Sequence, residues 1–157
     1  MDTLKNDTIT LKGTYDFEIR RADGSLRDKW TVDNLVTNAG FAQLALLCGD
    51  AAAVPFTFLA VGTSSTAPAV GNTTLVAETT TNGLARVAGT VSRITTAVTN
   101  DTYKITTTWT ASGSVTVEEV GVFNAASAGT MLSRALTGTK AVVNGETLAG
   151  TYSLRFA

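Results

Sequence analysis

Apolar and polar residues alternate with a period of two along much of this chain, and this pattern limits its fold more than any other feature. Tyr15, Phe17 and Ile19 are apolar, whereas the residues between them are charged, and the same period recurs over residues 102–111 and 147–156. Such alternation is typical of strands that bury one face. Threonine, which is β-branched and favours strands, supplies 29 of the 157 residues. The chain is therefore predicted to be mainly β-sheet.

The expected strands are short and regularly spaced. Besides a hairpin near the N-terminus, they cover residues 56–61, 86–99, 102–111, 115–123, 131–137, 140–143 and 147–156. Short strands joined by polar turns indicate a sandwich or a barrel. We expect an all-β fold, a jelly-roll-like antiparallel β-sandwich with one short α-helix.

Phase changes and turn residues refine this prediction. The apolar pattern slips by one residue within 86–99 and again at residues 118–119, and each slip predicts a β-bulge. The Asn-Asp pair at residues 100–101 predicts a tight turn between two long strands. The Asn-Gly pair at residues 144–145 is a strong hairpin signal, so the last two strands are predicted to pair through it.

Charge is distributed unevenly, with a step after residue 33. Thirteen of the 25 charged residues lie in residues 1–33, and the following 44 residues hold only Asp50. We therefore predict a charged N-terminal hairpin or arm over residues 1–33 and a β-sandwich domain over residues 34–157. The first segment is either an outer hairpin of the same domain or an arm that docks on a neighbouring subunit. The charged residues of this candidate arm are Arg20, Arg21, Asp23, Arg27 and Lys29.

One helix is predicted directly after the charge step. Thr37 or Asn38 can cap it, because a short side-chain oxygen accepts from the free N–H groups of the first turn. Apolar residues then recur at three- and four-residue spacing until Gly49 ends the helix. The helix is apolar on more than one side and is expected to pack over one end of a sheet. Cys48, the only cysteine, lies in an apolar run and is interpreted as a small buried residue rather than a reactive thiol.

The sequence offers little for catalysis because it contains no histidine, the usual proton shuttle near neutral pH. Glu118 and Glu119 are adjacent, but neighbours in a strand point to opposite faces. They are interpreted as one solvated glutamate and one bonded to nearby backbone or arginine. We find no nucleophile elbow and no phosphate-binding glycine-rich loop. We therefore expect no enzymatic activity, no catalytic residue and no cofactor.

Metal binding is also not expected. Asp23, Asp28 and Asp33 are spaced five residues apart in and around strands, which does not match a calcium-binding loop. They are interpreted as surface charge. Zinc would require cysteine or histidine ligands that the chain does not supply.

Two further partner classes are not favoured. Nucleic-acid binding would use clustered basic residues, but the basic residues near the N-terminus are mixed with seven acidic ones, and the net charge is −1. A membrane span is not predicted, because proline, glycine, serine and threonine interrupt the longest uncharged stretch, residues 51–77. A glycan-binding face could use Trp30, Trp109 and Tyr103, although core packing is the simpler interpretation of these aromatic residues.

The segment over residues 51–77 is the leading candidate for a partner contact. It has no charged residue, and the cores of protein interfaces are depleted in charge. It also holds a long loop, and loops longer than about 12 residues are usually functional or mobile. The residues proposed for this contact are Gly62, Thr63, Pro68, Gly71 and Asn72.

A series of short motifs resembles a group of small virion proteins of tailed bacteriophages. In chain order the motifs are Asn34-Leu35-Val36-Thr37-Asn38-Ala39-Gly40, Val61-Gly62-Thr63, Ala67-Pro68, Thr73-Thr74-Leu75 with Glu78, Glu119-Val120-Gly121-Val122-Phe123-Asn124-Ala125, Gly129-Thr130-Met131-Leu132-Ser133-Arg134 and Gly145-Glu146-Thr147-Leu148. They span residues 34–155 and leave the charged N-terminal segment outside. The family's frequent Asp before the Thr-x-Leu step is Asn72 here.

The resemblance implies a non-enzymatic virion component that is assembled in the host cytoplasm and has no catalytic residue to carry over. The first hypothesis is a capsid cement or decoration protein that binds the outside of the shell. Its expected partners are the major capsid protein or other virion proteins, together with further copies of itself in a homo-oligomer. The alternatives are a tail-fibre, collar or baseplate component and, outside this class, a glycan-binding module.

Overall fold

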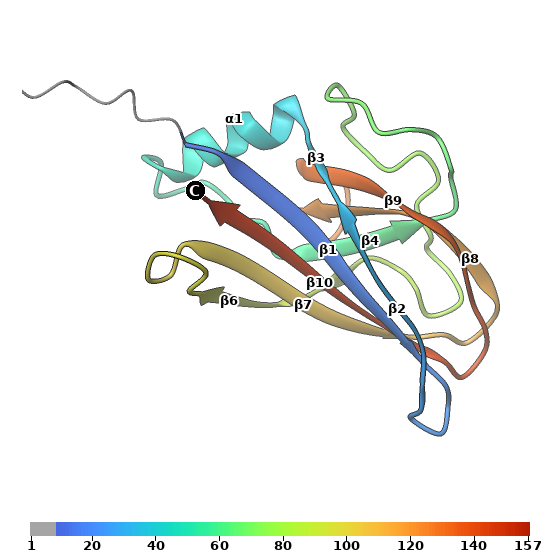
Figure 1. Cartoon of the computed structure of the whole chain (residues 1–157). Coiled ribbons are helices and arrows are strands. Elements are labelled where there is room, and N and C mark those ends of the chain that lie inside the picture. Colours follow the sequence, from blue (N-terminus) through green and yellow to red (C-terminus); the bar gives the residue numbers. More distant parts are fainter. Residues whose placement is uncertain (1–8) are drawn as a thin grey trace, which may run out of the picture.

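The computed structural model describes residues 9–157, which form two five-stranded antiparallel sheets that pack face to face (Figure 1). Sheet A has the strand order β2-β1-β10-β7-β6, and sheet B has the order β3-β9-β8-β4-β5. The single helix of this part of the chain, α1 (Asn38–Leu47), lies across one end of the sandwich. The prediction of an all-β sandwich with one short helix is confirmed. The strands are β1 (Leu11–Arg20), β2 (Leu26–Asp33), β3 (Leu35–Val36), β4 (Phe58–Gly62), β5 (Val87–Ala88), β6 (Thr90–Ile94), β7 (Thr102–Thr110), β8 (Val115–Phe123), β9 (Met131–Val142) and β10 (Thr147–Phe156).

The core lies between the sheets and is built from the inward-facing residues of the alternating strands. Tyr15, Phe17 and Ile19 of β1 are each at most 1% exposed. Two of them pair in register with buried residues of β10, Tyr15 with Tyr152 and Ile19 with Leu148. Because side chains alternate between the two faces of a strand, the charged residues of β1 lie on the outer face. The period-two pattern therefore decides which residues enter the core.

The N-terminal hairpin is an integral part of sheet A. Its turn has Gly24 at a φ of 84°, a conformation that glycine adopts without strain. β1 lies between β2 and β10 and pairs with β10 along its whole length. Its inward residues belong to the same core cluster as those of sheet B. The predicted boundary after residue 33 thus marks a change in charge rather than a separate core. Residues 1–8 of the predicted arm lie outside the described residues.

The predicted irregularity at residues 118–119 is confirmed in position, but the extra residues lie in the partner strand. The register between β8 and β9 shifts between Val117 and Glu119, where Glu118 alone lies opposite residues 137–139 of β9. β9 is one continuous strand where two were predicted. Gly138 of β9 has a φ of 70°, which explains why the apolar pattern is interrupted there although the strand continues.

The prediction of one long, bulged strand over residues 86–99 is wrong. The segment holds two short strands, β5 in sheet B and β6 in sheet A, separated by Gly89. At Gly89 the chain passes so close to β7 that an added Cβ would lie 2.3 Å from Ile105 Cγ2. The change of phase therefore marks a crossing between sheets. Residues 95–101 form the loop between the paired strands β6 and β7, and it ends in a tight turn close to the predicted position. In this turn the Asp101 N–H donates to the Val98 carbonyl at 3.1 Å, and Asn100 has a φ of 61°.

The predicted hairpin through residues 144–145 is also wrong. β9 belongs to sheet B and β10 to sheet A, so the turn carries the chain from one sheet to the other. Gly145 does have the positive φ, 85°, that this turn chemistry predicts. The strand pairing differs because β10 lies between β1 and β7 in sheet A and has both edges occupied.

Helix α1 begins where the sequence predicts. Thr37 is its N-cap: the Oγ1 atom accepts a hydrogen bond from the Gly40 N–H at 2.9 Å and donates one to the Met131 carbonyl at 2.6 Å. The helix ends at the predicted place, just before Gly49. The prediction that Cys48 is buried is wrong, because its side of the helix faces an open pocket rather than a sheet. Cys48 is exposed, and its thiol donates to the Leu44 carbonyl at 3.4 Å.

Candidate functional site

The predicted contact loop lies over sheet B and is held there by a buried ion pair. Arg134 of β9 and Glu119 of β8 both have fully buried side chains. The Arg134 Nε donates to Glu119 Oε2 at 2.7 Å. A charge in the protein interior is expensive unless it is paired and its remaining hydrogen-bonding atoms are satisfied. The loop residues supply those remaining partners.

Arg134 binds the first half of the loop. Its Nη2 donates to the Thr66 carbonyl at 2.7 Å, and its Nη1 donates to Asn72 Oδ1 at 3.2 Å. The same Asn72 oxygen accepts the Ala69 N–H at 2.8 Å, which closes a small turn within the loop. One guanidinium thus bonds the backbone of Thr66 and the side chain of Asn72, six residues further along the loop. The neutral amide at residue 72 accepts these bonds without adding a second buried carboxylate.

Glu119 binds the second half of the loop. Its two carboxylate oxygens accept the backbone N–H groups of Val76 and Ala77, at 3.1 and 2.7 Å. Gly62, at the end of β4, pairs with Glu119 and lies so close that a Cβ there would be 2.5 Å from Glu119 Oε1. We call Arg134, Glu119 and the loop atoms bonded to them the clamp. It makes the loop over residues 63–77 an ordered surface.

A second arginine holds the chain beyond this loop. The Arg86 Nε and Nη2 donate to the two carboxylate oxygens of Glu78 at 2.9 and 2.6 Å. Its Nη1 donates to the carbonyls of Ala125 and Ala128, and its guanidinium lies 3.6 Å from the centre of the Phe123 ring. The irregular segment between β4 and β5 is therefore anchored to β8 and the loop that follows it.

The structure brings the predicted contact residues to one loop, but they have different roles. Asn72 and Gly62 belong to the clamp or pack against it, whereas Thr63 and Gly71 are exposed and Pro68 is half-buried. The interpretation of the glutamate pair is confirmed in its main point. Glu119 is bonded to backbone and arginine, whereas Glu118 is half-buried and accepts a hydrogen bond from the Thr139 hydroxyl at 3.0 Å.

The charges of the candidate arm are mostly paired within the chain. Glu18 bonds Arg20 at 2.9 Å and Lys29 at 3.1 Å, and these hydrogen bonds, with the one from Lys29 the stronger, lower the pKa of Glu18. Arg27 contacts Glu146 at 3.0 Å. The other two residues bond within the β1–β2 turn, where Arg21 donates to Ser25 and Asp23 accepts the Ser25 N–H. These five residues share a hairpin without forming one site.

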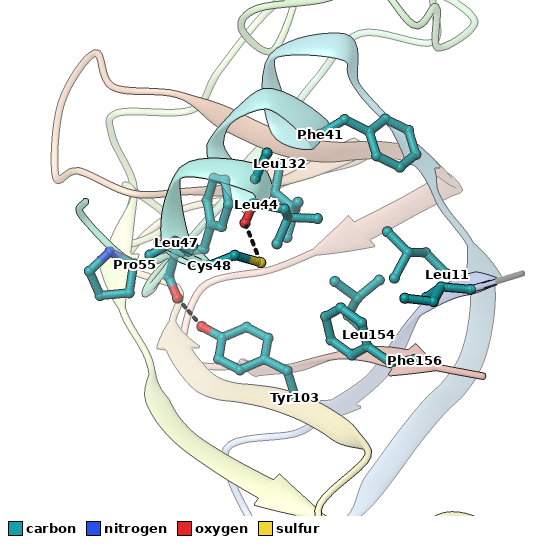
Figure 2. Close-up of a pocket in the computed structure, with 13 residues that line it drawn as sticks. Leu11, Phe41, Leu44, Leu47, Cys48, Pro55, Tyr103, Leu132, Leu154 and Phe156 are labelled. Carbon is teal, nitrogen blue, oxygen red and sulfur yellow. Dashed lines mark hydrogen bonds between the residues drawn. The ribbon is translucent and has the colours of Figure 1, made fainter. Parts of the chain in front are cut away.

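An apolar pocket of about 600 Å³, which was not predicted, lies between α1 and the adjoining ends of β1, β7 and β10. Figure 2 shows Leu44 of the helix facing Leu11, Leu154 and Phe156 of sheet A across an open space. The two polar groups of its lining are occupied. The Tyr103 hydroxyl donates to the Phe56 carbonyl, and the Cys48 thiol donates to the Leu44 carbonyl. The feature of the sequence that could have indicated this pocket is the helix with apolar residues on more than one side.

Neither tryptophan offers a free stacking face. Trp109 is 3% exposed, and its Nε1 donates to the Ala85 carbonyl at 2.8 Å. Trp30 stacks on Phe17 with ring centres 5.1 Å apart, and the Lys140 ammonium lies 4.5 Å from the centre of its ring. Both indole rings are thus engaged within the protein, which does not favour a sugar-stacking site at either residue.

Besides the ion pair of the clamp, three tyrosines place ionisable groups in or against the core. Burial raises the pKa of Tyr15, Tyr103 and Tyr152 above the usual value for tyrosine. Across residues 9–157 no group of three or more cysteine, aspartate or glutamate residues is placed to hold a metal ion. In the same residues, no helix has the length and apolar character needed to cross a membrane.

Several of the short motifs quoted from the sequence meet around β9. The cap residue Thr37 bonds the Met131 carbonyl, and Gly40 packs against Leu132, where a Cβ would lie 2.3 Å from the carbonyl oxygen. Arg134 and Glu119, which come from two different motifs, form the centre of the clamp. Segments far apart in the sequence thus build one unit that fixes the helix and the loop on sheet B.

No protein-family model, curated protein or solved structure matches this chain. What the protein does must therefore be inferred from its own residues and their geometry. Two surfaces carry that inference: the clamped loop over residues 63–77, and the apolar pocket beside α1.

Proposed function

We propose that this chain is a non-enzymatic structural protein of a tailed-bacteriophage virion. Its role is that of a capsid cement or decoration protein, which binds the outside of the shell and stabilises it. The partner that this role requires is the major capsid protein or another protein of the shell.

The observation that carries this proposal is the clamp. It holds in place an uncharged loop that carries two exposed valines, Val70 at 49% and Val76 at 54%. Contact surfaces between proteins are depleted in charge at their centres. A loop that is already ordered also loses less conformational entropy on binding than a mobile one. The clamped loop is therefore the surface we assign to the shell contact.

The stabilisation of a shell by a cement protein follows from the coupling between binding and assembly. A protein that binds the assembled lattice more tightly than it binds free shell subunits shifts the equilibrium toward the assembled state. No bond has to be made or broken. An ordered loop on a rigid sandwich fits this role, because a contact that deformed easily would transmit little resistance to expansion of the shell.

The proposal is tested on particles from which the protein has been stripped. Adding back the wild-type protein should restore binding and raise the temperature at which the shells burst. Val70→Lys should lose both effects, because it places a charge at the centre of the contact. Leu26→Lys is the matched control, since Leu26 is 47% exposed but lies in β2, far from the loop. If stripped and decorated shells burst at the same temperature, the cement role is wrong.

The number of copies per particle distinguishes a shell protein from a tail protein. A cement protein is present in hundreds of copies per particle, whereas a tail-fibre, collar or baseplate component is present in only a few. The ratio of this protein to the major capsid protein on a stained gel distinguishes the two locations. Electron microscopy of labelled particles would then show where the protein lies.

A further inference from the structure

A small apolar cluster, separate from the core between the sheets, lies on the outer face of sheet B. We call it the outer cluster. Its buried members are Ala60 of β4, Leu75 of the clamped loop, Phe123 of β8 and Met131 of β9. Side chains alternate between the two faces of a strand, and the neighbouring residues Leu59, Val122 and Leu132 face the core between the sheets. The strand residues of the outer cluster therefore point away from that core and toward the loop.

The clamped loop contributes Leu75 to the outer cluster. This leucine is 5% exposed, whereas the next residue, Val76, is 54% exposed. Adjacent residues of the loop thus point in opposite directions, one toward the sheet and the other into solvent. Burial of Leu75 therefore sets the direction of Val76, which belongs to the surface assigned to the shell contact.

A glycine of β8 makes room for this leucine. The residues on either side of Gly121 face the core between the sheets, so Gly121 itself faces the loop. A Cβ at Gly121 would lie 3.0 Å from Leu75 Cδ2, 3.1 Å from Phe123 Cε2 and 3.2 Å from Met131 Sδ. These distances are shorter than ordinary van der Waals contacts. Leu75 therefore fills a depression whose floor is the backbone of Gly121.

The clamp lies beside this depression. Arg134 pairs in register with Gly121, and Glu119 lies two residues before Gly121 in β8. Glu119 accepts the N–H groups of Val76 and Ala77, the two residues that follow Leu75. These hydrogen bonds fix the direction of the segment. Burial of the leucine side chain adds the hydrophobic free energy that keeps the segment closed.

We propose that Leu75 is a positioning residue of the shell contact, and that it holds the second half of the clamped loop as a unit that opens separately from the sandwich. The outer cluster shares no buried residue with the core between the sheets, so this unit can open while that core stays closed. Segments with few buried contacts open more often than a core does. The role in the contact rests on the proposed function, whereas separate opening is a property of the free protein.

Hydrogen exchange at single amides tests the separate opening. In the wild type, the Val76 and Ala77 N–H groups should exchange faster than the amides of β1 and β10. Leu75→Ala should speed the exchange of these two amides by at least about tenfold, because a truncated leucine leaves a cavity under the loop. The amides of β1 and β10 should be nearly unchanged. Leu75→Met, which keeps most of the side-chain volume, should restore slow exchange.

Binding to stripped shells tests the positioning role. Leu75→Ala should bind at least about tenfold more weakly than the wild type, and Leu75→Met should restore binding. Leu148→Ala is the matched control, since Leu148 is also buried but lies in β10 and in the core between the sheets. It should lower the melting temperature without weakening shell binding, which separates positioning from a general loss of stability. Ile19→Val, a smaller truncation in the same core, serves as the control if Leu148→Ala does not fold.

Two outcomes would overturn the inference. Leu75→Ala could bind shells as tightly as the wild type, which would show that Leu75 does not position the contact. The Val76 and Ala77 amides could exchange only together with those of β1 and β10, which would show that the loop does not open separately. A wild-type protein that fails to bind shells would contradict the proposed function and the positioning role with it. Hydrogen exchange would still decide whether the loop opens separately.

Discussion

At Arg134, a full positive charge lies in the interior and is compensated by three different kinds of partner. These are the Glu119 carboxylate, a backbone carbonyl at Thr66 and the amide oxygen of Asn72. The planar guanidinium suits this position because its donors point in fixed, separate directions. A lysine could not bond the same three groups at once. The clamp thus joins two strands to a loop through a single side chain.

Removing the arginine should therefore be far more damaging than removing an exposed one. Arg134→Ala leaves Glu119 buried without its counter-ion, and breaking such a pair lowers the free energy of unfolding by about 3–5 kcal/mol. Arg93→Ala, at an exposed position of β6, is the matched control and should change it by less than about 0.5 kcal/mol. Denaturant unfolding measures both. Equal losses in the two variants would mean that the clamp contributes nothing beyond an ordinary surface arginine.

Asp101 orders the loop between β6 and β7 through its carboxylate. The group accepts the backbone N–H groups of Thr96, Ala97 and Val98 at 2.8–2.9 Å. These hydrogen bonds, with that from Val98 the strongest, hold the pKa of the Asp101 carboxyl well below its usual range. Because the pKa is lower in the folded than in the unfolded chain, the stabilisation is complete above the unfolded value. It is lost as the pH falls from there toward the folded value.

We therefore expect Asp101→Asn to be less stable than wild type at neutral pH. The difference should shrink below about pH 4, where wild-type Asp101 begins to protonate in the unfolded chain. Melting temperatures of the two proteins across the acidic range measure this convergence. A difference that stayed constant down to the most acidic pH would show that the carboxylate charge is not what holds the loop.

At the scale of elements, α1 is attached to the sandwich by few contacts. The cap residue Thr37 bonds β9 at one end of the helix, and Gly40 lets the helix backbone approach Leu132. Beyond this first turn Leu44 packs against the core, and the helix forms a wall of the pocket. The position of the helix thus depends on its residues up to Leu44, because those that follow are exposed.

Gly40→Ala tests this attachment. The added Cβ would lie 2.3 Å from the Leu132 carbonyl oxygen, so the helix or β9 must move. Overpacking of this kind costs about 1–3 kcal/mol of stability. Gly49→Ala, just beyond the other end of the helix, meets no atom within 4 Å and should be nearly neutral. Thermal unfolding compares the two, and a neutral Gly40→Ala would mean that the helix is not held by close contact with β9.

At the scale of the whole molecule, polar core residues connect the two sheets. Tyr15 of sheet A bonds the Ser133 hydroxyl of sheet B at 2.7 Å, and Asn34 donates to the Tyr152 hydroxyl at 3.0 Å. The rings of Tyr15 and Tyr152 are 4.8 Å apart. Burial keeps these hydroxyls neutral, since ionisation would place a charge between the sheets. Alkaline pH should therefore destabilise both sheets together, because these hydroxyls connect them.

All three tyrosines have a raised pKa, which predicts that their ionisation is coupled to unfolding. Below about pH 10 both the folded and the unfolded chain keep these protons, so stability does not depend on them. Above it only the unfolded chain releases them, and stability falls as the pH rises. Tyrosinate absorbance should appear together with the loss of the β-sheet circular dichroism signal. Full ionisation of a chain that is still folded would contradict the prediction.

Much of the fold could be predicted because its signals are local. The alternation in β1 and β10 and the cap at Thr37 each depend on neighbouring residues. The site could be predicted only in part. An uncharged loop was visible in the sequence, but the arginine that orders it lies 62 residues beyond Asn72. The pocket could not be predicted, because its walls come from α1, from four strands (β1, β7, β9 and β10) and from the loop that follows the helix.

Which residues face inward, where the helix starts and which turns need glycine could be predicted from the sequence, because periodicity and turn chemistry act within a few residues. Which sheet each strand joins could be learned only from the packed fold. Gly89 and Gly145 have the turn or close-approach chemistry expected of glycine, yet both lie where the chain crosses between sheets. The tertiary structure also decided the partner of Arg134 and the exposure of Cys48. These outcomes depend on which surfaces meet when the two sheets pack, and residues distant in sequence set that arrangement.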